Sequence, residues 1–267
     1  MTYRLVVFDV DGTLADSFPW FSAVFNDVAD RFGIRRVAPD EVAAMRRCGP
    51  RELLAMLGVA RWKVPMIARH MRALKTEAIA TIPLFPDAGK MLAAVAARGP
   101  VLTVVSSDTE ANVRAMLGPE KAALVRHFAC SAGMFGKARK FRAVLRRFGV
   151  RPHEAIAIGD EVRDAEAARA VGMAFGAVTW GYTDAAVMRA CGPDLVFERM
   201  DEIASALTPP FERRRRPPVA PTIVPTSTPV SVPAGVPMSA PRIAPVIAAA
   251  RGRPFRPVPV RRSHSVR

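Results

Sequence analysis

Five short runs of apolar residues recur along the first 207 positions and predict the strands of one sheet. Within each run the branched and aromatic residues follow one another with few polar interruptions, which is typical of parallel strands buried on both faces. The predicted strands cover residues 4–10 (RLVVFDV), 101–107 (VLTVVSS), 154–160 (EAIAIGD), 174–180 (AFGAVTW) and 194–198 (DLVFE).

Segments with helical periodicity separate these strands, and two of them stop at a Gly-Pro pair. Repeated alternation of strand and helix predicts an α/β protein with a Rossmann-like, three-layer core around a parallel sheet. The first two strands lie farther apart than one crossover requires, and the segment 18–82 between them has helical patterns throughout. This segment predicts a small inserted α-helical subdomain. The expected helices of the core cover residues 87–99, 109–118, 138–149 and 161–172.

The composition changes sharply after Leu207. Residues 208–267 contain eleven arginines, one acid and 14 of the 24 prolines, and eight of these prolines recur at every fourth position from Pro217 to Pro245. Proline at this density removes amide donors and blocks helix and sheet, so we expect a disordered Pro/Arg-rich tail. The predicted organisation is an α/β core of residues 1–17 and 83–207, the helical insertion 18–82, and the tail 208–267.

Charge follows the same division. The chain carries a net charge of +15, of which the tail contributes +10. Arginines spread along a disordered segment predict weak, non-specific and salt-sensitive binding to polyanions. A solubilising extension without a partner fits the composition equally well, and nothing in the sequence predicts the oligomeric state.

Polar side chains collect where the predicted parallel strands end. Ligands of open α/β sheets bind beyond the carboxyl ends of the strands. Buried carboxylates would cost several kcal/mol each unless a cation neutralised them, and hard oxygen ligands suit Mg²⁺ completed by a substrate phosphate. We therefore expect a magnesium site there, in a cluster that contains Asp9, Asp11, Ser106, Ser107, Lys137, Asp160 and Asp164.

Four stretches in this region resemble the four motifs of the haloacid dehalogenase (HAD) superfamily. They are DVDGTLADS (residues 9–17), Ser106 within VVSSDTEANV, Lys137 within FGKA, and GDEVRDAEAA (159–168). The resemblance covers residues 4 to about 206, and AVTWGYTDAAV is similar to the corresponding segment of phosphoglycolate-phosphatase-like members. It implies a phosphatase that acts on a small phosphorylated metabolite, with residues 18–82 as a helical cap.

The resemblance also implies roles for individual residues. Asp9 would be the nucleophile that forms an aspartyl-phosphate, and Asp11 would be the general acid and base. Mg²⁺ would be held by the carboxylates of Asp9 and Asp160 and the main-chain carbonyl of Asp11, with Asp164 supporting this arrangement. The phosphate-binding residues would be Thr13, Ser106, Ser107 and Lys137.

Several of these assignments have alternatives. Ser106 could serve only the helix that starts near Thr109, although Ser107 or Asp108 fits the capping position better. Lys140 competes with Lys137 for the phosphate-site role. Glu161 could touch the metal site, but the first turn of a helix suits its charge better.

Two further features lie in the predicted cap and in the loop that follows it. Arg46, Arg47 and Arg51 could meet a second anionic group, or could belong to ordinary solvated surface. Pro86-Asp87 stands where similar proteins usually have Pro-Gly, which leaves the geometry of this loop open.

Other functions remain possible on the same residues. A phosphomutase would share every core residue, and a catalytically dead scaffold would depend on the basic tail. A dehalogenase would not need an acid at position 11, and a phosphonate hydrolase would use a cap lysine to form an imine.

The remaining composition predicts a cytoplasmic protein. Three cysteines without C-x-x-C spacing argue against disulfides or a thiolate zinc site and suit a reducing compartment. The apolar run starts too close to Met1 for a secretory leader. No run approaches the roughly 20 apolar residues that a membrane-spanning helix needs.

Overall fold

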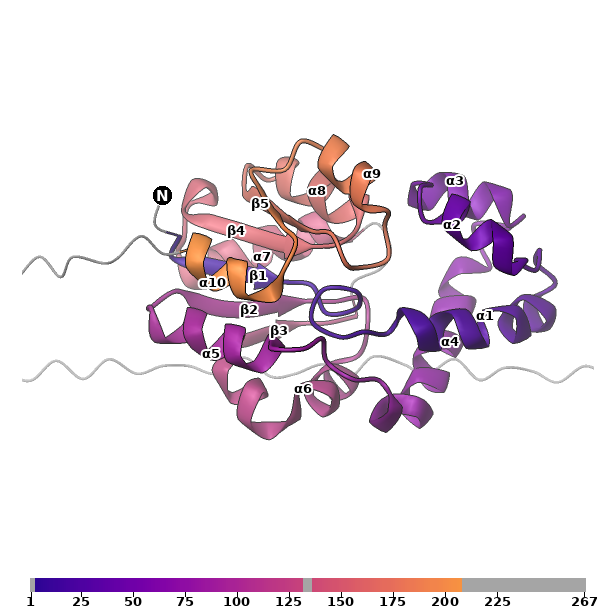
Figure 1. Ribbon diagram of the computed structural model, residues 1–267, viewed down its shortest axis with the longest axis horizontal. Helices are drawn as coiled ribbons and strands as arrows, with labels where there is room; N and C mark the ends of the chain where they lie inside the picture. Colours follow the sequence, from indigo (N-terminus) through magenta and orange to yellow (C-terminus); the bar gives the residue numbers. More distant parts are fainter. Residues whose placement is uncertain (1–2, 132–135, 208–267) are drawn as a thin grey trace, which may run out of the picture. The chain divides into compact units, whose positions relative to one another are not determined.

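The computed structural model of the chain describes residues 3–131 and 136–207, and its centre is a six-stranded parallel sheet (Figure 1). The strand order is β3-β2-β1-β4-β5-β6, so the chain moves outward from β1 first to one side and then to the other. This reversal beside β1 is where open α/β sheets place their ligands. The strands are β1 (Leu5–Phe8), β2 (Val101–Val105), β3 (His127–Ala129), β4 (Ala155–Gly159), β5 (Ala174–Val178) and β6 (Leu195–Phe197).

Helices cover both faces of the sheet, as the sequence predicts. Successive side chains of β1 point to opposite faces. Val6 and Phe8 belong to one apolar cluster, and Leu5 and Val7 belong to the other. The first cluster includes residues of α5 (Ala88–Ala97), α6 (Glu110–Leu124) and α10 (Met200–Ala206); the second includes α7 (Lys137–Phe148), α8 (Val162–Arg169) and α9 (Ala185–Ala190). The predicted three-layer α/β fold is therefore confirmed.

The segment between β1 and α5 is helical, and residues 18–82 are called the helical insert below. Its helix α1 is capped by Gly33, and the Lys63 ammonium before α4 donates to the Phe32 carbonyl oxygen (2.7 Å). That these residues form a separate subdomain with the predicted bounds stays a prediction. The elements of the insert are α1 (Phe18–Phe32), η1 (Pro39–Glu41), α2 (Val42–Met45), α3 (Pro50–Met56), α4 (Val64–Ala78) and η2 (Ile79–Thr81).

The structure differs from the sequence-based expectation at four elements, β3, α6, α9 and α10. Strand β3 is missed because its three residues follow Arg126 and begin with His127, so they do not form an apolar run that would predict a strand. Helices α9 and α10 are also missed because they are short. The expected stop at Gly118-Pro119 is a kink: Gly118 has a φ of 70°, and helical structure resumes as far as Leu124.

Two expectations concern membranes and the tail. Within residues 3–131 and 136–207, no helix is long and apolar enough to cross a membrane. The predicted tail lies outside the described residues.

The loop that leads from the helical insert back to the core contains Pro86-Asp87, where similar proteins usually have Pro-Gly. Asp87 has a φ of 63°, in the left-handed region where glycine is the usual residue. Aspartate tolerates this region better than most residues with a side chain. The loop therefore keeps a glycine-type conformation with an aspartate in it, and Asp87 pairs with Lys90 (2.8 Å).

Candidate active site

The loop after β1 is a tight turn that brings two aspartates to the edge of the sheet. The carbonyl oxygen of Val10 accepts hydrogen bonds from the amides of Thr13, Leu14 and Ala15. Gly12 has a φ of 74°, and a Cβ on it would lie 2.2 Å from Asp160 Oδ2. Only glycine therefore lets this turn approach Asp160.

The register of the sheet explains why residues far apart in sequence meet here. Phe8 of β1 pairs with Val104 of β2 on one side and Ile158 of β4 on the other. Asp9, Ser106 and Asp160 follow these three positions by one or two residues, so all leave the sheet at the same edge. The structure thus brings together residues that the sequence only places at separate strand ends.

Three buried carboxylates form the centre of the site. One oxygen from each of Asp9, Asp160 and Asp164 lies within 4.8 Å of the others. Asp160 accepts hydrogen bonds from Thr13 Oγ1 and from the Tyr182 amide, both at 2.7 Å. Asp164 Oδ2 is buried and has no hydrogen-bond partner among the residues that the structure describes. An orphaned carboxylate oxygen beside two other acids fits a hard divalent cation such as Mg²⁺.

The same burial perturbs the titration of these acids. Burial raises the pKa of Asp160 well above its ordinary value, and the neighbouring charges of Glu161 and Asp9 raise it further. Burial also raises the pKa of Asp164, to about 7; Lys137 opposes this effect and Asp9 adds to it. A bound cation would add positive charge beside both carboxylates and favour their ionised forms.

Lys137 is a cation that the chain itself places in direct contact with this cluster. It is the first residue of α7 and is buried, and its Nζ donates to Asp9 Oδ2 (2.5 Å) and to Asp164 Oδ1. Burial lowers the pKa of Lys137, but the two carboxylates outweigh it and hold the pKa above its usual value. The competing Lys140 instead donates to the Cys130 carbonyl oxygen (3.1 Å).

The loop after β2 places Ser106 and Ser107 at the same edge. Ser106 is buried, and its hydroxyl oxygen accepts the Asp108 amide (3.0 Å). The expectation that Ser107 or Asp108 caps α6 is wrong, because Thr109 is the capping residue and its Oγ1 accepts the Asn112 amide (3.2 Å). Thr109 is the N-cap because its backbone has the extended conformation that this position requires.

Sequence reasoning missed Lys75, which reaches the site from the helical insert. This residue of α4 is only 4% exposed; its Nζ donates to Asp11 Oδ1 and lies 2.9 Å from Asp108 Oδ2. Burial lowers its pKa, but Asp11 and Asp108 raise it more, so the pKa lies above that of an ordinary lysine. No spacing rule marks Lys75 in the sequence, because a lysine on an amphipathic helix normally faces solvent.

Asp11 has a second partner in Ser17, which begins the connection to α1. Ser17 Oγ donates to Asp11 Oδ1 (2.6 Å) and lies 3.1 Å from the Tyr182 hydroxyl. Burial is the main cause that raises the pKa of Tyr182 well above its usual value. Asp11 is therefore held by one group from the helical insert and one from the link to it.

The arginines that the sequence offered for a second anionic group have other partners. Arg46 donates through Nε to the Tyr182 carbonyl oxygen (3.0 Å) and through Nη2 to that of Gly181 (2.6 Å), and its guanidinium lies over the Phe18 ring. Arg47 pairs with Asp184 (3.5 Å). Glu161 precedes α8 and pairs with Arg163.

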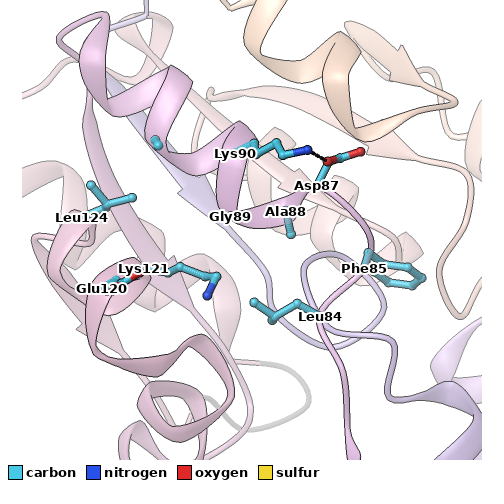
Figure 2. Close-up of a pocket in the computed structure, with 10 residues that line it drawn as sticks. Leu84, Phe85, Asp87, Ala88, Gly89, Lys90, Glu120, Lys121 and Leu124 are labelled. Carbon is cyan, nitrogen blue, oxygen red and sulfur yellow. Dashed lines mark ion pairs between the residues drawn. The ribbon is translucent and has the colours of Figure 1, made fainter.

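A separate hollow of about 630 Å³ lies between the start of α5 and the second half of α6. Figure 2 shows Leu84, Phe85 and Leu124 along it, with Lys121 extending toward Gly89 and Lys90 paired with Asp87. None of the predicted site residues lines it. The candidate chemistry therefore belongs to the carboxylate cluster and not to this hollow.

Comparison with known proteins defines the class. The family model of haloacid dehalogenase-like hydrolases matches residues 6–178, so the chain belongs to the haloacid dehalogenase-like hydrolase family. The motif resemblance that the sequence analysis describes is thereby confirmed.

Particular relatives match this chain over nearly their whole length. A phosphoglycolate phosphatase of Synechococcus elongatus is 29% identical over 77% of this chain and 97% of its own, and one of Mesorhizobium japonicum is 29% identical over 78% and 96%. Among solved structures, a haloacid dehalogenase-like hydrolase from Streptococcus pneumoniae matches 77% of this chain and 99% of its own, with a TM-score of 0.65 at 20% identity. CbbY of Rhodobacter sphaeroides, solved with phosphate, has a TM-score of 0.58 at 22% identity, covering 76% of this chain and 96% of its own.

Proposed function

We propose that the protein is a Mg²⁺-dependent phosphatase that hydrolyses a small phosphomonoester through an aspartyl-phosphate on Asp9. One observation carries the proposal: the cluster of Asp9, Asp160, Asp164 and Lys137 beside Asp11 at the edge of the sheet. Carboxylates without enough positive charge, next to a fixed ammonium, suit a metal and a transferring phosphoryl group.

The chemistry divides one hydrolysis into two displacements. A carboxylate oxygen of Asp9 attacks phosphorus, the bond to the leaving oxygen breaks, and Asp11 gives that oxygen a proton. Asp11, now a carboxylate, takes a proton from water, and the water oxygen attacks phosphorus to release inorganic phosphate and free Asp9. Asp11 is suited to this because it follows Asp9 by two residues at the end of β1, and its side chain is 21% exposed and so open to water.

The remaining residues hold the metal and the phosphoryl oxygens. The Asp9 and Asp160 carboxylates and the Asp11 carbonyl would hold Mg²⁺, which neutralises the charge on the phosphoryl oxygens. Lys137, Ser106 and Ser107 would donate to these oxygens. The Thr13 hydroxyl, which we also expected at the phosphate, donates to Asp160 and orients that ligand.

The substrate and setting follow from the relatives and the composition. Relatives named phosphoglycolate phosphatase match nearly end to end, so we propose a phosphoglycolate-like metabolite as substrate. The helical insert would act as the cap that excludes water during phosphoryl transfer. All three cysteines are free and half-buried, in keeping with a cytoplasmic enzyme.

A phosphonate hydrolase is the second candidate, because Lys75 is a lysine of the insert at the site. Imine formation requires a neutral amine. Lys75 is instead held between Asp11 and Asp108, and the two carboxylates raise its pKa. The phosphatase is therefore the better supported function.

Phosphate release from a panel of phosphomonoesters, with and without Mg²⁺, tests the proposal. We expect Mg²⁺-dependent release that excess chelator removes. Activity that persists in chelator would overturn the metal's role. In parallel, borohydride added with phosphonoacetaldehyde would trap an imine on Lys75, and a trapped adduct would favour the second candidate. Conversion of a sugar monophosphate to its isomer without phosphate release would identify a mutase.

A further inference from the structure

We propose that Arg46 of the helical insert is a positioning residue for the metal site. It fixes the peptide unit between Gly181 and Tyr182, whose amide holds Asp160, and so makes Mg²⁺ binding depend on how the insert packs on the core. The inference rests on the Mg²⁺ site of the proposed function and assigns control of that site to the insert.

The loop after β5 passes close to Asp160. The Tyr182 amide donates to Asp160 Oδ2 (2.7 Å), and a Cβ on Gly181 would lie 2.2 Å from Asp160 Cβ. Glycine is therefore required for this approach. The other oxygen of Asp160 accepts the Thr13 hydroxyl (2.7 Å). Since Asp160 is 0% exposed, these two donors rather than water orient its carboxylate.

Arg46 binds the carbonyl groups of the same two residues. Its Nη2 donates to the Gly181 carbonyl oxygen (2.6 Å), and its Nε donates to the Tyr182 carbonyl oxygen (3.0 Å). The Gly181 carbonyl and the Tyr182 amide belong to one peptide unit, and in a trans unit they point in opposite directions. Arg46 therefore lies at one end of this unit and Asp160 at the other.

This arrangement joins a positive and a negative charge through a single peptide unit. The Arg46 guanidinium polarises the carbonyl and so strengthens the amide as a donor to the carboxylate. Rotation of the unit would break both hydrogen bonds together, and glycine at position 181 hinders that rotation little. Arg46 thus opposes the motion that would release Asp160 Oδ2.

Arg46 is itself held by the insert. It follows α2, and its amide donates to the Val42 carbonyl oxygen (3.1 Å). Its guanidinium lies 5.0 Å from the centre of the Phe18 ring of α1, a cation–π contact. Its carbonyl oxygen accepts the Asp184 amide (2.9 Å), so both its main chain and its side chain bind the loop after β5. The position of this loop therefore depends on the insert.

The contacts of Arg46 separate a role at the metal from a role in substrate binding. The pair of donors Nε and Nη2, which would bind a carboxylate or phosphate side-on, is occupied by the two carbonyls. A change at Arg46 should therefore alter the affinity for Mg²⁺ and leave the KM for substrate unchanged. By linkage, if packing of the insert raises the affinity for Mg²⁺, then Mg²⁺ favours the packed insert by the same factor.

Calorimetric titration of the metal-free full chain with Mg²⁺, without substrate, tests the effect of Arg46 on the metal. Arg46→Met removes both donors and should weaken Mg²⁺ binding roughly 10-fold, a loss typical of groups that orient a metal ligand. Arg46→Lys should recover part of the affinity, because an ammonium can donate to the carbonyls without the planar fork. The KM for phosphoglycolate at saturating Mg²⁺ should equal that of the wild type.

Arg47→Met is the matched control. It removes the same charge from the adjacent position, but the Arg47 side chain is 69% exposed and pairs with the Asp184 carboxylate (3.5 Å) instead of the peptide unit at Asp160. Its Mg²⁺ affinity should equal that of the wild type.

Hydrogen exchange tests the reverse effect, of Mg²⁺ on the insert. Saturating Mg²⁺ should slow amide exchange in α2 of the wild type and should not do so in Arg46→Met. A residue that only stabilises the insert would change exchange in α2 equally with and without Mg²⁺, and that result would overturn the coupling.

Each failure has its own signature. A wild type that neither binds Mg²⁺ nor shows Mg²⁺-dependent hydrolysis overturns the metal's part in the proposed function, and this inference with it. Mg²⁺ binding that Arg46→Met leaves unchanged, or that Arg47→Met weakens equally, overturns the role of Arg46 alone. A raised KM with unchanged Mg²⁺ affinity would make Arg46 a substrate contact instead. Should Arg46→Met not fold, Arg46→Lys with Arg47→Lys as its control gives the same comparison.

Discussion

The α/β core and the helical insert use charge in opposite ways. Residues 1–17 and 83–207 contain 17 Lys and Arg and 17 Asp and Glu, whereas residues 18–82 contain 11 against 6. The net charge of +5 on the first 207 residues therefore belongs entirely to the insert. The core concentrates buried acids at one edge of its sheet, and the insert brings net positive charge to them.

This difference indicates a division of tasks. The core holds Asp9, Asp160 and Asp164 in fixed positions, where the excess negative charge suits a metal. Most cations of the insert are at least partly exposed and would attract an anionic substrate in a general way. Lys75 is the exception: it is buried, and among the ion pairs of residues 3–131 and 136–207 it is the insert cation that pairs with Asp11. Changes in the core should therefore affect chemistry, and changes in the insert should act through its contacts with the core.

The largest expected effect comes from the core nucleophile. Asp9→Asn should lower turnover by roughly 10⁴-fold or more, since an amide cannot form the acyl-phosphate. Single-turnover assays with circular dichroism would measure both the loss and the integrity of the fold. Asp27→Asn, an exposed acid of the insert, is the control and should keep its activity. A substantial residual rate in pure Asp9→Asn would contradict the division.

The second prediction concerns metal and pH in the core. Burial raises the pKa of Asp160 and of Asp164, the latter to about 7, above the unfolded value of about 3.9. The folded state then binds protons more tightly, so metal-free protein should lose stability as pH rises from about 4 to about 7. Lys137 does not reverse this, because its raised pKa matters only above about pH 10.

Mg²⁺ should restore that stability most where the acids are ionised. At 100 times its Kd a ligand adds about 2.7 kcal/mol, roughly 5 to 10 °C in melting temperature for a domain of this size. We expect such a gain at pH 8 and a much smaller one at pH 5, measured by calorimetry. Asp160→Asn should abolish the difference between the Mg²⁺-dependent gains in stability at pH 8 and at pH 5. Equal gains at both pH values would show that these acids do not hold the metal.

The same division explains what the sequence could predict. Asp9, Ser106 and Asp160 follow apolar runs, and parallel strands end at one edge, so local patterns suffice to group them. Lys75 could not be found in this way, because its burial depends on how α4 packs on the loop with Ser107 and Asp108. Strand β3 and the cap at Thr109 were missed for a related reason: tertiary pairing and backbone conformation decide them.

A smaller effect is expected in the loop between insert and core. Asp87→Gly should stabilise the protein by up to about 1 kcal/mol, because the left-handed conformation suits glycine and the exposed pair with Lys90 contributes little. Denaturant titration would measure the change. Lys90→Met, which removes the same ion pair without changing the backbone, is the control. A destabilised Asp87→Gly would mean that the ion pair outweighs the strain.

The smallest effect on catalysis is expected from the segment 208–267, which carries twice the net positive charge of the insert. It offers no acid or base at a motif position, and the family match ends at residue 178. A chain that ends at Leu207 should therefore hydrolyse a small phosphomonoester at close to the full-length rate.

The affinity of this shortened chain for an oligonucleotide or for anionic vesicles should be lower than that of the full-length chain. The full-length affinity should weaken steeply as salt rises, because arginines bind phosphates largely by counterion release. Turnover and binding measured side by side at two salt concentrations check both parts. Equal and negligible binding by the two chains would remove the polyanion role, and a large loss of turnover on truncation would mean that positive charge reaches the core from this segment as well as from the insert.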